Sequence, residues 1–361
     1  PPPRSTLFPY TTLFRSTSEE LEELGNIFLR IFELLNTEGG VPGINKDIAL
    51  AGQVSALPQW GSPIKFHPSM WNKDVNFKEE GDFIQLLSTL ITGPGELVRD
   101  SLRKFCYVGP LREVPKRGHR HATSPDLSRW ASGLAAYDRL FFAEDVFIER
   151  VNQWLTQESR LNSGYRIEQK KYRELVEEHP LMLAVLQGRL LDEDMDFRES
   201  LLGLPIKRRL LIRDEARDVE LEPQDIGVGI SQVLPVVVAA LGHKTGFVAI
   251  EQPELHIHPA FQVALGDLFI EQIRENPDLI FILETHSEHL LLRLLRRIRE
   301  AKEGSLHDCH VGIEPEKLSI NYLESTETKG TRIRRLLVSE DGDSLGDWPK
   351  GFFEERAGEL F

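Results

Sequence analysis

Two short runs of apolar residues stand out in the C-terminal half of the chain, and each run ends in a carboxylate. The runs are Phe247–Glu251 and Leu279–Glu284, and such stretches are typical of parallel strands covered on both faces. Between them, apolar residues recur at helical spacing from Phe261 to Ile273. Strand, helix and strand in this order predict a right-handed βαβ unit. Both carboxylates then lie at the carboxyl edge of an open sheet, where such sheets bind ligands.

Other periodic segments predict helices and a hairpin earlier in the chain. The capping-box pattern Thr17-Ser18-Glu19-Glu20 begins a helix that we expect to reach about Asn36. A second helix is expected around 81–104. The segments 209–213 and 219–221 flank the turn Asp214-Glu215-Ala216-Arg217 and predict a β-hairpin.

The first sixteen residues differ from everything that follows. They form a near repeat, in which the sequence Thr6-Leu7-Phe8 occurs again as Thr12-Leu13-Phe14, and they contain no acidic residue. The segment resembles translated sequencing-adapter read-through, although a short genuine N-terminus is the alternative. We expect residues 1–16 to be foreign and the natural N-terminal part of the protein to have been cut away.

Composition narrows the class of protein. The chain has 361 residues and a net charge of −14, which argues against a surface that coats nucleic acid by charge alone, although a local basic groove stays open. The sequence has no apolar run of about 18 residues, so no membrane span is expected. Two cysteines cannot form a disulfide framework, and the cytoplasm is the expected location.

The first apolar run continues into the polar segment Gln252-Pro253-Glu254-Leu255-His256-Ile257-His258-Pro259. A buried strand that delivers a carboxylate to its carboxyl end is the arrangement of a Walker B motif, in which the acid holds the water shell of Mg²⁺ beside nucleotide phosphates. Glu251 is therefore the candidate metal-associated residue. Taken alone, the run is equally compatible with any buried strand that ends in Glu.

The second apolar run leads directly into Thr285-His286-Ser287. At the end of a strand, His286 can place an imidazole on a γ-phosphate, and Ser287 or Thr285 can cap a helix predicted over 288–299. A histidine at a helix N-terminus without chemistry is the alternative.

A third motif, Asp225–Pro235, contains two glycines that let backbone N–H groups approach an anion. We expect Ser231 or Gln232 to begin a helix whose N-terminus favours negative charge, with Pro235 in about its first turn. A plain tight turn at Gly227 and Gly229 is the alternative.

In this order, the three motifs resemble those of the ATP-binding-cassette-type ATPases of the genome-maintenance and phage-defence group. These are relatives of RecF, of the structural-maintenance-of-chromosomes proteins and of the overcoming-lysogenization-defect nucleases. The segment Gly109-Pro110-Leu111-Arg112 and the ending Trp348–Glu355 resemble a bacterial "predicted ATPase" branch. The resemblance implies an α/β, P-loop NTPase-like core with a mostly parallel sheet, an inserted helical region and a small C-terminal domain.

The resemblance also implies roles for single residues. It assigns catalysis to Glu251 as the Walker B acid, to Gln252 in place of the water-polarising glutamate, and to His286 as the switch histidine. It assigns nucleotide contacts, made partly across a dimer interface, to Gly227, Gly229, Ser231, Gln232, Glu254 and His258. We therefore expect Glu251, His286 and Ser231 to converge around ATP and Mg²⁺.

The implied organisation has four parts. Residues 1–16 are the adapter-like segment, 17–104 a remnant of the N-terminal ATPase lobe, 105–303 the ATPase core and 304–361 the small C-terminal domain. The signature loop and the loop after Walker B imply a homodimer, and DNA or a partner effector protein is a possible further ligand.

Two departures from the family pattern affect the expected activity. No G-x-x-x-x-G-K-[ST] motif occurs in the chain, and this motif supplies the phosphate cradle. We expect it to belong to the missing N-terminal part, so this copy is predicted to be inactive alone. Gln252 can position water but cannot accept its proton, so either turnover is slow or Glu254 or His286 takes that role.

Two other classes of function remain open. A metallohydrolase would require the convergence of Glu254, His256, His258, Glu284, His286 and His289. A non-catalytic interaction module would need no nucleotide. Four arginines of the helix after Ser287 could also meet nucleic-acid phosphates, although a solvated face is the alternative: Arg293, Arg296, Arg297 and Arg299.

Overall fold

The computed structural model describes residues 77–123, 128–186, 199, 201–326, 330–343 and 348. The chain divides into two compact units, Pro1–Arg103 and Lys104–Phe361. In the first unit the structure describes helix α2 (Phe77–Leu102), which corresponds to the helix expected around 81–104. The adapter-like segment and the helix expected over 17–36 lie outside the described residues.

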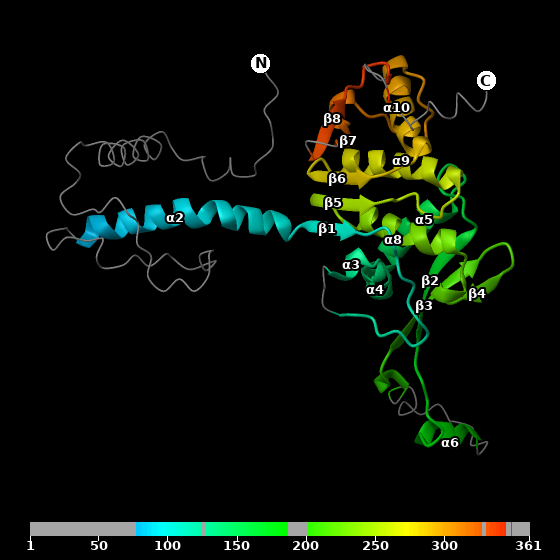
Figure 1. Ribbon diagram of the computed structural model, residues 1–361. Helices are drawn as coiled ribbons and strands as arrows, with labels where there is room; N and C mark the ends of the chain where they lie inside the picture. The colour runs from blue at the N-terminus through cyan, green and yellow to red at the C-terminus, as the bar shows by residue number, and fades with distance from the viewer. Residues whose placement is uncertain are drawn as a thin grey trace, which may run out of the picture. The chain divides into compact units, whose positions relative to one another are not determined.

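A parallel sheet forms the centre of the second unit (Figure 1). Its strands are β1 (Phe105–Val108), β5 (Gly246–Glu251) and β6 (Leu279–Glu284), in the order β1-β5-β6. Helix α9 (Pro259–Glu275) connects β5 to β6, so the predicted strand–helix–strand unit is present. The register pairs Glu251 with Glu284, because both strands run in the same direction and end together.

Helices cover one face of this sheet. Helix α8 (Val228–Gly242) packs against β1 and β5, and α9 packs against β6. Val248 and Ile250 are buried on that face. On the other face Ile280 is 46% exposed and Ile282 is 50% exposed, because β6 is the edge strand and no described element packs there. The expectation that both apolar runs are covered on both faces is therefore wrong for β6 within the described residues.

Helix α8 begins earlier than the sequence suggested. Gly227 is its N-cap, Pro235 lies in its interior, and all of residues 230–241 are buried. Proline has no N–H and cannot bond to the carbonyl of Ser231, four residues earlier. The buried Tyr137 hydroxyl, 3.5 Å away, donates to that carbonyl instead. The predicted start at Ser231 or Gln232 was wrong, because the tertiary partner makes an interior proline tolerable.

A further layer of helices and an antiparallel sheet lies between β1 and α8 along the chain, and two of its helices pack against α8. The helices are α3 (Ser128–Ala131), α4 (Leu134–Phe142), α5 (Asp145–Thr156) and α6 (Pro180–Leu186), and the strands are β2 (Tyr165–Tyr172), β3 (Lys207–Asp214) and β4 (Val219–Leu221). The expected hairpin is present, since β3 and β4 pair with Arg213 opposite Glu220. Trp154 and Tyr137 are among the largest fully buried side chains, so this layer shares the core of the unit.

Helix α10 (Glu288–Glu303) and a C-terminal hairpin, β7 (Ile320–Thr326) and β8 (Gly330–Leu336), complete the second unit. The Ser287 hydroxyl accepts from Leu290 N at 3.0 Å, so Ser287 is the cap of α10. No helix of the described residues is both long and apolar enough to span a bilayer.

The basic stretch of α10 is engaged within the protein. Arg293 and Arg297 pair with Asp267 on α9, Arg296 pairs with Glu300, and Arg299 pairs with Asp343. The side chains of Arg293 and Arg297 are largely buried by these pairs, whereas those of Arg296 and Arg299 are 61% and 46% exposed. A contact of this helix with nucleic-acid phosphates stays a prediction.

Candidate functional site

Two carboxylates lie side by side at the carboxyl edge of the parallel sheet. Glu251 and Glu284 are register partners at the ends of β5 and β6. The Tyr107 hydroxyl, from neighbouring β1, donates to Glu251 Oε1 at 2.8 Å. This hydrogen bond is the main reason that the pKa of Tyr107 is raised. All three strands therefore contribute a polar group to one edge of the sheet. The sequence predicted this for β5 and β6, whose apolar runs end in Glu251 and Glu284.

The chain turns sharply directly after Glu251. Gln252 has a φ of 44°, which is a left-handed conformation that costs a non-glycine residue roughly 1–2 kcal/mol. Its backbone is held in place, because Gln252 N donates to Glu284 O at 2.8 Å and Leu255 N donates to Gln252 O at 3.0 Å. The half-buried amide side chain therefore begins at a fixed position beside the two carboxylates.

A buried arginine holds this turn by hydrogen bonds to its backbone carbonyls. Arg112 is 4% exposed, and its Nη2 donates to Glu251 O at 2.7 Å and to Gln252 O at 3.0 Å. Its Nη1 donates to Gln232 O in α8 at 3.2 Å, and Gln232 Nε2 donates back to Arg112 O at 2.8 Å. Burial lowers the pKa of Arg112 to about 10. We call this set of bonds the arginine bracket; it joins the segment after β1, the turn after β5, and α8.

The sequence analysis did not assign a role to Arg112 or to Tyr107. Arg112 ends the segment Gly109–Arg112 that carried part of the family resemblance, and Tyr107 lies two residues before that segment. This resemblance was the signal available. Their partners are more than 100 residues away along the chain, so no local spacing reveals them.

Glu254 ties the turn after β5 to the loop after β6. Its Oε2 accepts from the Thr285 hydroxyl at 2.8 Å, and its Oε1 accepts from His286 N at 2.7 Å. Because both oxygens have donors, Glu254 orients the loop that carries His286. Both oxygens of Glu254 are therefore engaged in holding this loop.

The His286 ring lies at the same edge and is open to solvent. Its side chain is 74% exposed, and Nε2 is 3.2 Å from Glu284 Oε1. When Nε2 carries the ring hydrogen it donates to this carboxylate, which leaves Nδ1 as a proton acceptor. The structure therefore brings together Glu251, Gln252, Glu254, Glu284 and His286.

The loop before α8 lies close to this edge, but two of its candidate side chains point inward. Ser231 is buried and its hydroxyl donates to Val228 O at 2.8 Å, and Gln232 belongs to the arginine bracket. The accessible part of the loop is Gly227 and Val228, and no described side chain caps the helix there. A Cβ added at Gly229 would lie 3.4 Å from His256 O, so the loop is in contact with the segment after β5.

The remaining candidate, His258, is the N-cap of α9. Its Nδ1 accepts from Ala260 N at 3.2 Å, and the residue is exposed. Within the described ranges, the His and Glu residues considered for a metallohydrolase do not form a group of ligand atoms close enough to share an ion. The geometry therefore gives no support to a metal centre built from these residues.

Comparison with known families agrees with this description. Residues 115–293 match the family described as "AAA domain, putative AbiEii toxin, Type IV TA system", which is a P-loop NTPase family of α/β fold. The matched segment contains α8, β5, β6 and both loops at the carboxyl edge. It indicates nucleotide-binding ATPase activity, for which such families generally use ATP and Mg²⁺. No curated protein matches the chain significantly.

Proposed function

We propose that this chain carries the Walker B, switch-histidine and signature parts of an ATPase of the RecF and overcoming-lysogenization-defect group. The observation that supports the proposal most strongly is the convergence of Glu251, Gln252, Glu284 and His286 at one sheet edge. These groups come from two separate sequence motifs, the one after β5 and the one after β6. A buried strand that ends in Glu by chance would not explain why the second motif lies beside it.

The residues present fit a magnesium ion. Mg²⁺ prefers oxygen ligands and keeps much of its water shell, and Glu251 offers a carboxylate that Tyr107 orients at the open edge. Glu251 would hold the ion through a water molecule. When bound, the ion neutralises charge on the transferring phosphoryl group.

Hydrolysis requires water to attack the γ-phosphorus while the bond to the ADP oxygen breaks and the water loses a proton. Gln252 is placed to orient that water, but its amide cannot accept the proton. Of the two acceptors that the sequence left open, Glu254 is occupied by Thr285 and His286. We therefore assign the proton to the His286 imidazole, which Glu284 supports as the charge develops.

The composite site would be completed by other polypeptide. The chain has no G-x-x-x-x-G-K-[ST] sequence, so the phosphate cradle is supplied from outside these 361 residues. The uncapped N-terminus of α8 at Gly227 and Val228 favours an anion, and in a head-to-tail homodimer it would meet the phosphate held by the partner subunit. Such an ATPase acts in the cytoplasm, in DNA maintenance or phage defence, with DNA or an effector protein as its further ligand.

A comparison of this chain with an intact relative that has the phosphate loop tests the proposal. The relative should bind ATP in the presence of Mg²⁺ and lose turnover when the residue matching Glu251 becomes Gln, whereas this chain alone should show little binding in calorimetry. A relative that binds no ATP would favour a non-catalytic interaction module instead.

The identity of residue 252 provides a second test. Replacing the matching Gln by Glu in an intact relative restores a base beside the attacking water, and we expect hydrolysis to accelerate about tenfold or more. The matched control replaces Gln by Asn, which keeps an amide and should not accelerate the reaction. An unchanged or lower rate for the glutamate variant would contradict the role of Gln252.

A further inference from the structure

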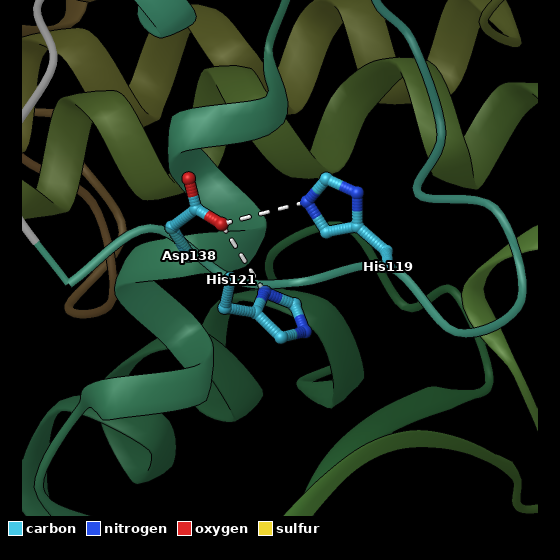
Figure 2. A group of neighbouring side chains, drawn as sticks. All are labelled: His119, His121 and Asp138. Atoms are coloured by element: carbon cyan, nitrogen blue, oxygen red, sulfur yellow. Dashed lines mark hydrogen bonds and ion pairs between the residues drawn. The ribbon is translucent and has the colours of Figure 1, made fainter.

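A second cluster of ligand-type side chains contains none of the residues of the sheet edge (Figure 2). His119 and His121 come from the segment after β1, and Asp138 comes from α4. Their side chains are only 10–19% exposed. The three candidate ligand atoms all lie within 4.8 Å of one another, and this is the only such group among the described parts of the chain.

The spacing of these atoms is close to that of a metal site. His121 Nδ1 is 3.2 Å and His119 Nε2 is 3.7 Å from the same oxygen, Asp138 Oδ1. In a tetrahedral zinc site with bonds of about 2.1 Å, neighbouring ligand atoms are about 3.4 Å apart. Small side-chain movements would therefore be enough to place an ion between the three atoms.

The surroundings orient all three ligands. The His121 ring stacks on Phe141 with ring centroids 4.0 Å apart. Arg129 Nε donates to Asp138 Oδ2 at 2.7 Å. Oδ1 faces the histidines and also accepts from Ala122 N at 3.2 Å, so both oxygens of Asp138 are held in place. Outer partners of this kind are what metal ligands require.

Arg129 also competes for the site. Its Nη2 lies 3.1 Å from His119 Nε2, which is the atom that an ion would need. A bound ion would displace that contact, while the bond from Nε to Asp138 Oδ2 could remain. The positive charge of Arg129 therefore lowers the affinity of the cluster for metal without blocking it.

We propose that His119, His121 and Asp138 form a site for a divalent transition metal, with Zn²⁺ as the best match and water as the fourth ligand. Two imidazole nitrogens and one carboxylate suit Zn²⁺, whereas Mg²⁺ prefers oxygen alone. The site is separate from the ATPase edge. It would fasten the segment after β1 to α4, which packs on α8.

Zinc binding by the full chain tests the proposal directly. After equilibrium dialysis against Zn²⁺, elemental analysis should find one ion per chain, and the same sample should unfold at higher temperature. The double variant His119→Gln/His121→Gln should lose the ion and the thermal shift. The matched control is His256→Gln/His258→Gln, which removes a histidine pair of the same sequence spacing. This control should retain the bound ion and the thermal shift.

If the double variant does not fold, a variant at Arg129 still tests the proposal. Arg129→Met removes the competing cation and should tighten zinc binding about tenfold or more. The variant His307→Ala/Cys309→Ser removes a separate imidazole–thiol pair, whose Nδ1 and Sγ are 3.1 Å apart, and should not change the number of zinc ions bound per chain. Wild-type protein that takes up no zinc, or zinc that survives in the His119/His121 variant, would overturn the proposal. An affinity unchanged by Arg129→Met would do the same.

Discussion

Removal of the Arg112 guanidinium should destabilise the second unit substantially. The substitution Arg112→Met keeps an unbranched apolar chain of similar length but removes the donors of three hydrogen bonds. Those donors serve the carbonyls of Glu251, Gln252 and Gln232, at 2.7, 3.0 and 3.2 Å. The perturbation therefore separates the turn after β5 from α8 without creating a large cavity.

The magnitude follows from two opposing contributions. A hydrogen bond to a charged group contributes about 1.5–3 kcal/mol, so three contribute roughly 4.5–9 kcal/mol. Against this, burial lowers the pKa of Arg112 from 12.5 to about 10, which corresponds to a cost of about 3 kcal/mol for keeping the charge inside. The variant avoids that cost. We expect a net loss of about 3 kcal/mol in the free energy of unfolding.

Urea unfolding followed by circular dichroism measures this loss. The matched control is Arg117→Met in the same segment, because Arg117 is 73% exposed and pairs with Asp225 and Glu222 at the surface. Exposed ion pairs contribute at most about 1 kcal/mol. If the two variants lost equal stability, the arginine bracket would not be the connection that we describe.

Two further predictions concern stability. Gly133 has a φ of 78°, and a Cβ there would lie 3.1 Å from Arg112 Cβ and 3.2 Å from Pro235 Cγ, so Gly133→Ala should cost about 1–3 kcal/mol in urea unfolding. Gly118→Ala, with a φ of 74° and no neighbour within 4 Å, should cost only the backbone part, and an equal loss at both sites would refute the steric argument. Burial lowers the pKa of His243 below 6.5, so below pH 6.5 the unfolded chain binds more protons and stability falls on acidification. His243→Gln should flatten the dependence of unfolding free energy on pH between 7 and 5, and an unchanged slope would contradict it.

The parts of the fold that the sequence predicted well are those in which local pattern and tertiary environment agree. The bounds of β5 and β6 follow from apolar runs that pack into one core, and Ser287 caps α10 because its backbone position suits a hydroxyl acceptor. The common direction of β5 and β6 then brings Glu251 and Glu284 together, as the helix between them required.

The features that could not be predicted from the sequence depend on contacts between residues that are far apart along the chain. The start of α8 was misplaced because Pro235 usually marks a first turn, whereas here the Tyr137 hydroxyl compensates for the missing N–H. As a result, the Ser231 hydroxyl faces the helix rather than an anion. The roles of Glu254 and Arg112 likewise depend on loops that meet only after folding.

The arginine bracket also bears on how the proposed dimer would operate. Because the Arg112 side chain donates to both α8 and the turn after β5, a shift of one part relative to the other would break these hydrogen bonds. Contact of the Gly227 end with the neighbour's nucleotide would therefore be transmitted to the subunit's own water-positioning Gln252.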